Sequence, residues 1–590
     1  MCRICGIIDK KSQSLQRDTI RMRDSMHRGG PDNAGVFTDE INSVSLGHRR
    51  LSIIELNESG NQPMLSDDKN IILIFNGEIY NYLSLKEELA RFGFSFSTHS
   101  DTEVIIKAYQ KWGFNCFSKL RGMFTIAIFD QQKGELILAR DHAGIKPLYF
   151  YSDNECLYFA SEIKAFRQAE RKWQENPDWK VYFLTYGYLP GNITTLKEVK
   201  SLEKGSYIVF NVHTLKSTQH YFFEQNFTEE IFDHEEAKQI IRSSMELAVQ
   251  RHLIADASIG LFLSGGIDSS LLTLLANHYK RDLHTLSITF NEKNYTEKKY
   301  QDLIAKRVLS KHQSFLLDKN IFVKALPDIM QAMDQPSSDG INSYFISKFA
   351  KEAGLKAVIS GLGADELFGG YPSFKRAKIL SRLKKVPSFM FDATNILRKD
   401  KYKKINYLKQ KTPIGDYLFN RGYFVPSETA MLLDIDESEV SSNVYKLTMP
   451  AYLNTISQGN KTSYLETSLY MDGQLLKDTD YMSMWHSIEV RVPFLDYDLI
   501  KNVQKISSSI KYKNKQGKFL LIDSFSDILP PEIWNRKKQG FTFPFNEWMK
   551  GNLDQFMEGK QNQNLNKRFQ SGTLSWSRYW TYLVSQSFAV

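Results

Sequence analysis

Long hydrophobic runs and cysteines are both scarce in this 590-residue sequence, and each scarcity excludes a class of protein. No stretch approaches the roughly 18 consecutive apolar residues that a membrane-spanning helix needs, so we expect no membrane segment. The polar residues Asp9, Lys10 and Lys11 interrupt the N-terminus before a secretory hydrophobic region is formed. Four cysteines are too few for a disulfide framework, which fits a reducing compartment. These absences predict a soluble, cytoplasmic protein.

A strong charge of one sign is also absent. Lysine and arginine number 76 and aspartate and glutamate 67, which gives a formal net charge of +9. The basic residues concentrate at 375–385 and 398–411, but Ile379, Leu380 and Leu383 recur among them at helical spacing. We interpret these runs as solvated faces of amphipathic helices and expect no nucleic-acid partner. The aromatic content of 13% excludes general disorder.

Short β-rich segments separated by Gly, Asn and Asp dominate the first part of the chain. The predicted strands are 71–76, 123–129, 136–139, 148–151 and 206–210, and the predicted helices lie near 20–26, 83–91 and 103–111. Many short strands with few helices predict stacked sheets in an α+β arrangement. We place this first domain at residues 1–215.

Longer helices alternate with short apolar strands in the remainder of the chain. The predicted helices are 235–252, 269–278 and 296–308, and the predicted strands are 258–263, 283–289 and 356–360. This alternation predicts an α/β parallel sheet covered by helices, and after Gly370 the pattern becomes almost wholly helical. We therefore place a second domain with a largely helical extension at residues 230–590.

The segment Ser258–Ser270, SIGLFLSGGIDSS, joins an apolar strand to an apolar helix through a glycine turn. Gly265 and Gly266 let the backbone approach an anion closely because neither has a Cβ atom. The N–H groups of the turn and the start of the helix then point toward a phosphate. Hydroxyl donors at this turn come from Ser264, Ser269 and Ser270. The motif resembles the pyrophosphate loop of ATP pyrophosphatases, which adenylate a carbonyl oxygen and release pyrophosphate.

A second glycine-rich turn, SGLGADELFGGY, follows another predicted strand and begins at Ser360. Parallel strands present their carboxyl ends on one edge of a sheet, so we expect this turn to lie beside the first. Ser360 and Gly361 are then candidates for nucleotide binding. Asp365 and Asp268 form a pair of carboxylates suited to Mg²⁺ bound to pyrophosphate. The two turns together predict a site for ATP and Mg²⁺.

Cys2 follows the initiator methionine directly, so removal of Met1 gives this cysteine a free α-amino group. A nucleophile whose own amine is its base needs only this one residue, which explains the position. Cys2 and Cys5 also form a CxxC pair, which is compatible with redox chemistry or metal binding. A zinc site needs a second Cys/His pair at short spacing, and a thioredoxin-type site needs a preceding strand. Taken alone, the CxxC pair leaves these interpretations open.

Several downstream motifs occur together with the N-terminal MCRICGIID. They are HRGGPD (27–32), HRRLSI (48–53), QP (62–63), NGEIYN (76–81), SDTE (100–103) and RDHAGIKPLY (140–149). This set closely resembles the class II glutamine amidotransferase domain, which implies stacked antiparallel sheets of the N-terminal nucleophile hydrolase type. With both glycine-rich turns and DTDYMSMWHSIEVRVPFLD (478–496), nearly the whole chain resembles the asparagine synthetase B family.

The resemblance implies roles for residues in the first domain. Cys2 attacks the glutamine side-chain amide to give a glutamyl thioester and ammonia, while Asn76 and the Gly77 N–H stabilise the oxyanion. Such donors contribute roughly 3 kcal/mol each to transition-state stabilisation. Arg50 binds the glutamine α-carboxylate, and Glu78 and Asp101 hold its α-ammonium group. The implied glutamine-binding residues are Arg50, Leu51, Ile53, Asn76, Gly77, Glu78 and Asp101.

The resemblance also implies an ATP site in the second domain. Its residues are Phe262, Ser264, Gly265, Gly266, Asp268, Ser269, Ser270, Ile288, Ser360, Gly361 and Lys518. Lys518 matches a family lysine that neutralises charge developing on pyrophosphate, and Asp268 and Asp365 are the implied Mg²⁺ ligands. The implied partners are small molecules, namely glutamine, ATP and a carboxylate acceptor, and a homodimer is compatible with the sequence.

Three residues depart from the family pattern. Arg3 stands where the family usually has glycine, beside the nucleophile, and can therefore alter substrate access. Cys5 replaces a small residue, and we expect it to act as one. Leu362 replaces the usual glutamate of Ser-Gly-Glu-Gly at the acceptor position, and leucine neither binds a cation nor transfers a proton.

These observations predict a glutamine-hydrolysing, ATP-dependent ligase that amidates a carboxylate through an acyl-adenylate. With aspartate as acceptor, the product is asparagine. An alternative acceptor is a different carboxylate, such as a uronic acid in surface-polysaccharide synthesis. A further alternative, suggested by Leu362, is a binding or regulatory protein that keeps the fold without synthetase turnover.

Overall fold

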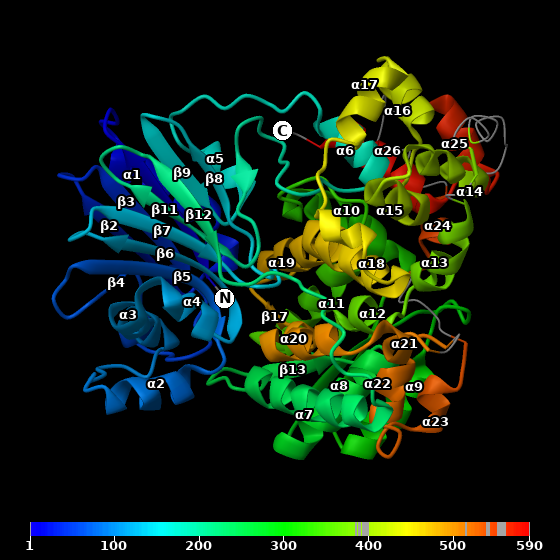
Figure 1. The fold of residues 1–590 in the computed structure, drawn as a ribbon, viewed down its shortest axis with the longest axis horizontal. Coiled ribbons are helices and arrows are strands. Elements are labelled where there is room, and N and C mark those ends of the chain that lie inside the picture. The colour runs from blue at the N-terminus through cyan, green and yellow to red at the C-terminus, as the bar shows by residue number, and fades with distance from the viewer. Residues whose placement is uncertain are drawn as a thin grey trace.

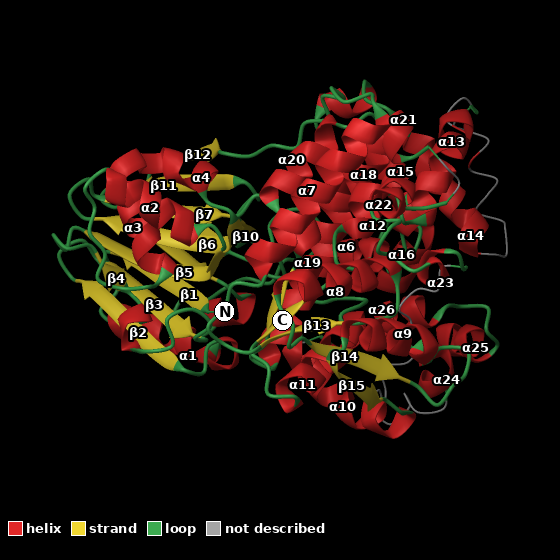
Figure 2. Ribbon diagram, turned by 90° about the horizontal axis from the view of Figure 1, so that it is seen from below, coloured by secondary structure: helices red, strands yellow, loops and turns green. Residues whose placement is uncertain are grey.

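The computed structural model describes residues 2–383, 386–387, 391, 400–513, 516–537, 543–550 and 562–588. Figure 1 shows a sheet-rich part, drawn in blue and cyan, beside a larger and mostly helical part drawn in green to red. Figure 2 separates the same two parts when they are seen from below. Within the described ranges, no helix is both long enough and apolar enough to cross a bilayer.

Two six-stranded antiparallel sheets stack in the first part. The first sheet has the order β10 (Lys200–Ser201), β8 (Tyr149–Ser152), β9 (Cys156–Ala160), β1 (Arg3–Asp9), β3 (Val44–Arg50) and β2 (Asn33–Asp39). The second has the order β12 (Ser217–Tyr221), β11 (Ser206–Asn211), β7 (Glu135–Arg140), β6 (Gly122–Asp130), β5 (Ile71–Ile79) and β4 (Met64–Leu65). This arrangement confirms the predicted sandwich of stacked antiparallel sheets.

Strand alternation explains how each sheet buries two faces. Ile4 and Ile8 on β1 pack with Ile72 and Ile74 on β5, so these side chains form the core between the sheets. Because successive side chains on a strand point to opposite faces, the intervening residues pack against helices outside the sandwich. These outer helices are α1 (Leu15–Ser25) and α5 (Ile163–Phe166) on one sheet, and α2 (Tyr82–Arg91), α3 (Asp101–Trp112) and α4 (Cys116–Lys119) on the other.

A five-stranded parallel sheet organises the second part. Its order is β15 (Lys311–Leu316), β14 (His284–Thr289), β13 (Ile259–Phe262), β16 (Ala357–Ile359) and β17 (Glu489–Arg491). Helix α7 (His234–His252) precedes the first of these strands in the chain, and the helices between β13 and β16 are α8 (Ile267–Tyr279), α9 (Lys298–Val308), α10 (Lys319–Ala332) and α11 (Ile341–Glu352). The predicted α/β alternation is confirmed. The prediction of a helical chain after Gly370 misses β17, which is only three residues long and pairs with β16.

Apart from β17, the described chain after β16 is mostly helical (Figure 1). Its helices are α12 (Ala364–Phe368), α13 (Pro372–Leu383), α14 (Asp400–Lys403), α15 (Pro413–Arg421), α16 (Pro426–Leu433), α17 (Glu437–Val444), α18 (Gln458–Leu465), α19 (Leu476–Trp485), α20 (Tyr497–Lys505), α21 (Ser508–Lys511), α22 (Phe519–Ser524), α23 (Pro531–Trp534), α24 (Phe545–Met549), α25 (Gln563–Gln570) and α26 (Trp576–Ser587). A π-helical segment, Glu466–Leu475, runs directly into α19. The first basic run begins within α13, whereas residues 384–385 and 398–399 lie outside the described residues.

The boundary between the two parts does not follow the order of the chain. Strand β12 extends the second sheet to Tyr221, beyond the residue 215 at which the sequence pattern changes. Helix α6 (Trp179–Tyr186) precedes β10 in the sequence but packs among α16, α17 and α26 of the helical part. Trp179 and Phe183 on α6 are buried in the same core as the parallel sheet. A split by sequence alone therefore does not describe how the chain packs.

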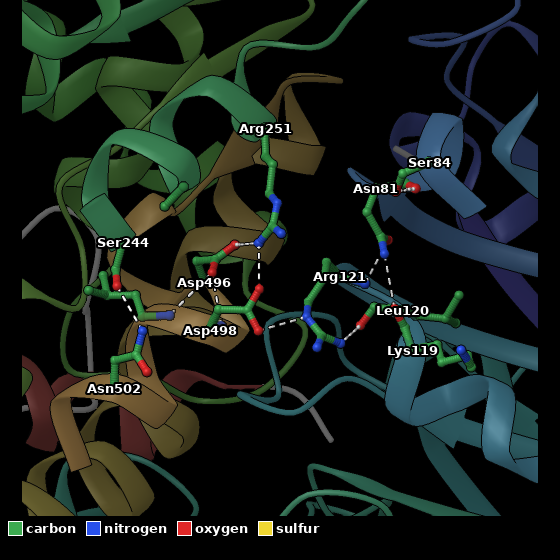
Figure 3. Close-up of polar contacts among 12 residues, drawn as sticks. Asn81, Ser84, Lys119, Leu120, Arg121, Ser244, Arg251, Asp496, Asp498 and Asn502 are labelled. Carbon is green, nitrogen blue, oxygen red and sulfur yellow. Dashed lines mark hydrogen bonds and ion pairs between the residues drawn. The ribbon is translucent and has the colours of Figure 1, made fainter. Parts of the chain in front are cut away.

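Ion pairs join the two parts across their interface, as Figure 3 shows. The Arg121 Nε atom of the sandwich lies 2.9 Å from Asp498 Oδ1 on α20. Arg251 Nη1 at the end of α7 lies 2.7 Å from the other oxygen of Asp498 and 3.5 Å from Asp496. The Asn81 side-chain oxygen accepts the Arg121 N–H at 2.9 Å and so fixes the backbone just before β6. The two parts are docked by specific polar contacts.

Candidate functional site

Cys2 and Asn76 are in contact in the buried interior of the sandwich. Cys2 lies just before β1 and Asn76 lies on β5, and both side chains are almost wholly buried. The Cys2 backbone N–H donates to Asn76 Oδ1 at 3.2 Å. The Asn76 Nδ2 atom is also buried, and it has no hydrogen-bond partner among the described residues. The Asn76 side-chain oxygen therefore fixes the Cys2 backbone, and the Asn76 side-chain nitrogen remains available as a hydrogen-bond donor.

Burial strongly affects the Cys2 thiol. Desolvation raises the pKa of Cys2 to about 11, while the Arg50 charge acts in the opposite direction. A backbone hydrogen bond from Leu51 also favours the thiolate form. The thiol is therefore protonated at neutral pH, and its use as a nucleophile requires a base beside it.

Gly77 and Ile53, two predicted glutamine-binding residues, have close backbone contacts with neighbouring segments. Gly77 has φ of 155°, and a Cβ atom there would clash with the Met123 carbonyl on β6. Ile53 is buried, and its carbonyl accepts the N–H groups of Asp256 and Ala257, each at 3.1 Å. Asp256 and Ala257 lie just before β13, so the loop that follows β3 rests on the second part of the chain.

Arg50 is buried at the end of β3 and is occupied by the neighbouring loop. Its Nη1 donates to the Asn57 carbonyl at 2.6 Å and to Asn61 Oδ1 at 2.9 Å. Its Nη2 donates to the carbonyls of Ile54 and Glu55. Arg50 therefore shapes loop 54–61, and a bound carboxylate would have to replace some of these loop acceptors.

Two buried carboxylates, Glu78 and Asp101, belong to the predicted glutamine-binding set. Asp101 begins α3, and its Oδ2 accepts the Ile79 N–H at 3.0 Å. Burial raises the pKa of Asp101 to about 6. Burial and the neighbouring Glu489 raise the pKa of Glu78 well above its ordinary value. A cationic group that binds beside these two carboxyl groups would therefore favour their ionised form.

The glycine turn after β13, which the sequence predicts to be a phosphate loop, leads directly into α8. Gly265 adopts φ of 81°, and Gly266 precedes the first residue of α8. The hydroxyls of Ser264 and Ser269 lie 3.0 Å apart, and Ser264 N–H donates to Ser269 Oγ at 3.2 Å. Ser270 Oγ is fully buried without a hydrogen-bond partner in the described part of the chain. The turn therefore presents hydroxyls and helix N–H groups together.

The turn after β16 lies against this loop, as the sequence predicts. A Cβ atom on Gly361 would meet the Asp268 Cβ at 2.9 Å, so glycine permits this close approach. The Ser360 N–H donates to the Arg491 carbonyl at 2.8 Å. Leu362 is partly buried and packs against the apolar core. Phe262 ends β13 and packs against the core, and Ile288 is buried in β14.

Lys518 joins the two turns through their carboxylates. Its Nζ atom lies 2.5 Å from Asp268 Oδ2 and 2.6 Å from Asp365 Oδ1. These two ion pairs raise the pKa of Lys518, so the ammonium group stays charged. Two carboxylates around one cationic centre are a suitable donor set for a hard divalent cation, so the residues fit Mg²⁺. Among the described residues, no group of three or more metal-ligating side chains occurs.

Three residues that contact the predicted sites were missed by sequence reasoning. Arg536 Nη2 donates to the Gly265 carbonyl at 2.9 Å and adds a positive charge at the phosphate loop. Arg491 on β17 lies 3.7 Å from Glu78, and Asp480 on α19 lies 2.8 Å from Arg3. Arg491 and Asp480 lie within the 478–496 motif. Their partners lie in the other half of the chain, so no local sequence pattern indicates these contacts.

The expectations for Arg3 and Cys5 have different outcomes. The Arg3 side chain turns toward Glu162 and Asp480 and is fully buried between them. Cys5 is also fully buried, and its thiol contacts the Thr19 carbonyl at 3.6 Å, as expected for a small packing residue. All four cysteines are free and buried, so Cys2 and Cys5 form no disulfide.

The two candidate sites lie at opposite ends of the parallel strands. The sandwich contacts residues that precede β13 and β16, including Lys356, whose Nζ lies 2.7 Å from Asp32. The phosphate loop and the Leu362 turn follow the same two strands. Strands of three or four residues at ~3.3 Å each separate these ends by about 10 Å.

Comparisons with known proteins cover both halves of the chain. A family model described as asparagine synthase matches residues 241–576, and one described as a glutamine amidotransferase domain matches residues 1–222. The chain is 32% identical to glutamine-hydrolysing asparagine synthetase 1 of Bacillus subtilis, over 94% of this chain and 89% of that protein. Glutamine-hydrolysing asparagine synthetase 3 of the same organism is 28% identical over 93% and 89%. Amidase chry2 of Gibberella zeae is 27% identical over 89% and 85%.

Proposed function

Because this chain belongs to the asparagine synthase family and is a glutamine-dependent ligase, we propose that it converts L-aspartate to L-asparagine. The overall reaction consumes glutamine and ATP and yields glutamate, AMP and pyrophosphate. The observation that carries this proposal is the pairing of two sites in one docked molecule. Cys2 and Asn76 form a candidate ammonia-releasing site, and Lys518 links two carboxylates at a phosphate loop. Glutamine-dependent amidation needs both.

The first half-reaction releases ammonia from glutamine. With Met1 removed, the Cys2 amine takes the thiol proton and the sulfur attacks the glutamine side-chain carbonyl. Asn76 supports this step because its Oδ1 holds the Cys2 nitrogen at 3.2 Å while its Nδ2 is free to bind the oxyanion. The tetrahedral intermediate then expels ammonia, and water hydrolyses the thioester to glutamate. Glu78 and Asp101 would hold the α-ammonium group of glutamine.

The second half-reaction activates the acceptor carboxylate. A carboxylate oxygen attacks the α-phosphorus of ATP, which gives an acyl-adenylate and pyrophosphate. Ser264, Ser269 and the helix N–H groups would bind the phosphates, and Lys518 would stabilise charge on the departing pyrophosphate. Ammonia then attacks the acyl carbon, and AMP leaves with the carboxyl oxygen that it carried.

Asp268 and Asp365 would hold Mg²⁺ at this site. A bound Mg²⁺ would neutralise phosphate charge and orient the pyrophosphate for departure. Lys518 now occupies the position between the two carboxylates. We infer that it shifts toward the pyrophosphate when ATP and the cation are bound together.

The apolar side chain of Leu362 favours, as an alternative, an acceptor other than aspartate. Its side chain packs against apolar residues, so this position supplies neither a charge nor a proton to the acceptor. A uronic acid or another carboxylate is therefore the second candidate substrate. The amidase name of the Gibberella zeae relative, which spans most of this chain, is consistent with variation of the acceptor within this family.

The deciding experiment measures pyrophosphate release with ATP and glutamine while the acceptor is varied. L-Aspartate and several uronic acids are supplied in turn, and the products are identified by mass spectrometry. Asparagine formed in equal amount with AMP supports the proposal. Release with a uronic acid but not with aspartate would replace aspartate by that acceptor, and glutamate formation without AMP under all conditions would reject both.

A further inference from the structure

Arg3 lies beside the proposed nucleophile and is fully buried, which is unusual for an arginine. Its Nε donates to Glu162 Oε1 at 2.5 Å, and its Nη2 lies 2.8 Å from Asp480 Oδ2. Glu162 belongs to the sandwich and directly precedes α5, whereas Asp480 lies on α19 in the ATP-binding part. A single side chain next to Cys2 therefore spans the junction between the two parts.

The surroundings hold Arg3 in this orientation. Lys146 Nζ contacts the other oxygen of Asp480 at 2.6 Å, and Lys164 pairs with the other oxygen of Glu162. The burial of an unpaired guanidinium is strongly unfavourable, so Arg3 keeps this position only while both carboxylates face it. The turn at His27–Gly29 closes over the side chain, because a Cβ atom on Gly29 would meet the Arg3 Cγ at 2.7 Å.

Helix α19 is firmly docked on the sandwich near this ion pair. The Tyr481 hydroxyl contacts the Tyr149 hydroxyl, and the Arg28 guanidinium stacks 3.7 Å above the Trp485 ring. Both contacts lie on the same helix as Asp480 and follow it within the last two turns. Movement of α19 relative to the sandwich would therefore be transmitted to Arg3.

The chain that follows α19 reaches the proposed ATP and acceptor loops. It passes through β17, where the Arg491 carbonyl accepts the Ser360 N–H at 2.8 Å. It then forms the short 3₁₀ turn Pro493–Leu495, and a Cβ atom on Gly363 would meet Leu495 Cδ2 at 2.7 Å. The segment from Asp480 to Leu495 thus connects Arg3 with the turn that contains Leu362.

We propose that Arg3 is a positioning residue that fixes Cys2 through its ion pair with Asp480. Glutamine hydrolysis in the sandwich then depends on correct docking of α19 from the other part of the chain. This inference rests on the proposed role of Cys2 as the nucleophile. Arg3 itself does not touch glutamine in this arrangement, because its guanidinium is enclosed by Glu162 and Asp480.

The test measures glutamine hydrolysis by the full-length protein without ATP, so that it does not depend on the acceptor. We expect Asp480→Asn to lower kcat by about 10- to 100-fold with KM for glutamine little changed, since misplacement by 1 Å can cost about 100-fold. Arg3→Met should have the same effect. The double variant should lose much less kcat than the product of the two single losses, because both changes break the same Arg3–Asp480 ion pair. Arg3→Lys should recover part of the lost kcat.

Arg121→Met is the matched control. It removes another ion pair across the same interface, with Asp498, but Arg121 is not adjacent to Cys2. We expect this variant to keep kcat near the wild-type value. Equal losses in Arg121→Met and Asp480→Asn would show a general effect of docking and overturn the proposal, as would an unchanged kcat in Asp480→Asn.

Further outcomes distinguish a failure of the proposed function from a failure of this inference. If the wild-type protein hydrolyses no glutamine, the proposed function fails before this inference is reached. If Arg3→Met unfolds at a lower temperature than the assay, Asp480→Asn decides the question, because asparagine keeps the shape of aspartate. A KM increase with unchanged kcat in Asp480→Asn would assign the pair to glutamine binding and reject the positioning role.

Discussion

Arg491 on β17 of the parallel sheet reaches across the interface to within 3.7 Å of Glu78 on β5 of the sandwich. The same guanidinium donates to Glu489 at 2.6 Å and to the carbonyl of His252 at 2.9 Å. It is fully buried and is the positive charge that faces two buried glutamates. A charged residue from the other half of the chain therefore lies beside a residue that the sequence predicts to bind glutamine.

Removal of this charge should destabilise the protein. We expect Arg491→Met to lower the free energy of unfolding by about 3–5 kcal/mol, since it leaves buried carboxylates without their partner. Urea denaturation measures the change. The double variant Arg491→Met/Glu489→Gln should recover part of the loss, because it removes one of the uncompensated charges. A loss below about 1 kcal/mol in the single variant would contradict the assigned pairing.

Replacement of Cys2 should separate the two half-reactions. We expect Cys2→Ala to abolish glutamine hydrolysis and to keep amidation driven by ammonium chloride, because the two sites lie at opposite ends of the parallel strands. An N-terminal extension that blocks Met1 removal should have the same effect by withholding the amine. Cys5→Ala is the control, since Cys5 is buried against Thr19 and should keep activity. Wild-type hydrolysis by Cys2→Ala would exclude Cys2 as the nucleophile.

Neutralisation of either carboxylate at the phosphate loop should impair ATP cleavage. We expect Asp268→Asn and Asp365→Asn each to lower acceptor-dependent pyrophosphate release by about 100-fold or more, because both are proposed to hold Mg²⁺ against ATP. Glutamine hydrolysis without ATP should persist in both variants and reports correct folding. Unchanged pyrophosphate release in one variant would remove that carboxylate from the metal site.

The glutamine site should lose efficiency in acid. Burial raises the pKa of Asp101 to about 6, so in the free protein this carboxyl gains a proton as the pH falls through that value. The neutral acid no longer attracts the α-ammonium group, so kcat/KM for glutamine should fall about tenfold per pH unit below about 6. Asp101→Asn should show a low kcat/KM and a shallower acid limb, because only the Cys2 amine still titrates there. A flat profile between pH 5 and 7 in the wild type would refute the role of Asp101.

The Leu362 position should influence acceptor choice. If aspartate is a poor substrate, Leu362→Glu should raise asparagine formation several-fold, because it restores a carboxylate for proton transfer at the turn after β16. Leu362→Met is the control for side-chain size. Product analysis by mass spectrometry distinguishes the two variants. Equal rates in both would show that this position does not select the acceptor.

The sequence alone was sufficient for the elements and motifs with a local signal. The short, apolar β-rich runs at 71–76 and 123–129 correctly predicted the central strands β5 and β6, whose observed bounds are Ile71–Ile79 and Gly122–Asp130. The two glycine-rich turns were predicted to be neighbours, and the Gly361 contact with Asp268 confirms this. These signals are local because strand periodicity and turn residues act within a few positions of the chain.

Only the tertiary structure decided which residues meet across the interface. Arg3 was interpreted as a change in access to the nucleophile, but its partner Asp480 lies far away in the sequence and leaves no periodic signal near it. Strand β17 was missed for the same reason, since three residues show no pattern until β16 supplies their hydrogen-bond partners. The residue types were determined by the sequence, but the pairing of Arg3 with Asp480 and of Arg491 with Glu78 depends on how the two halves dock. Buried charges require partners wherever the fold places them.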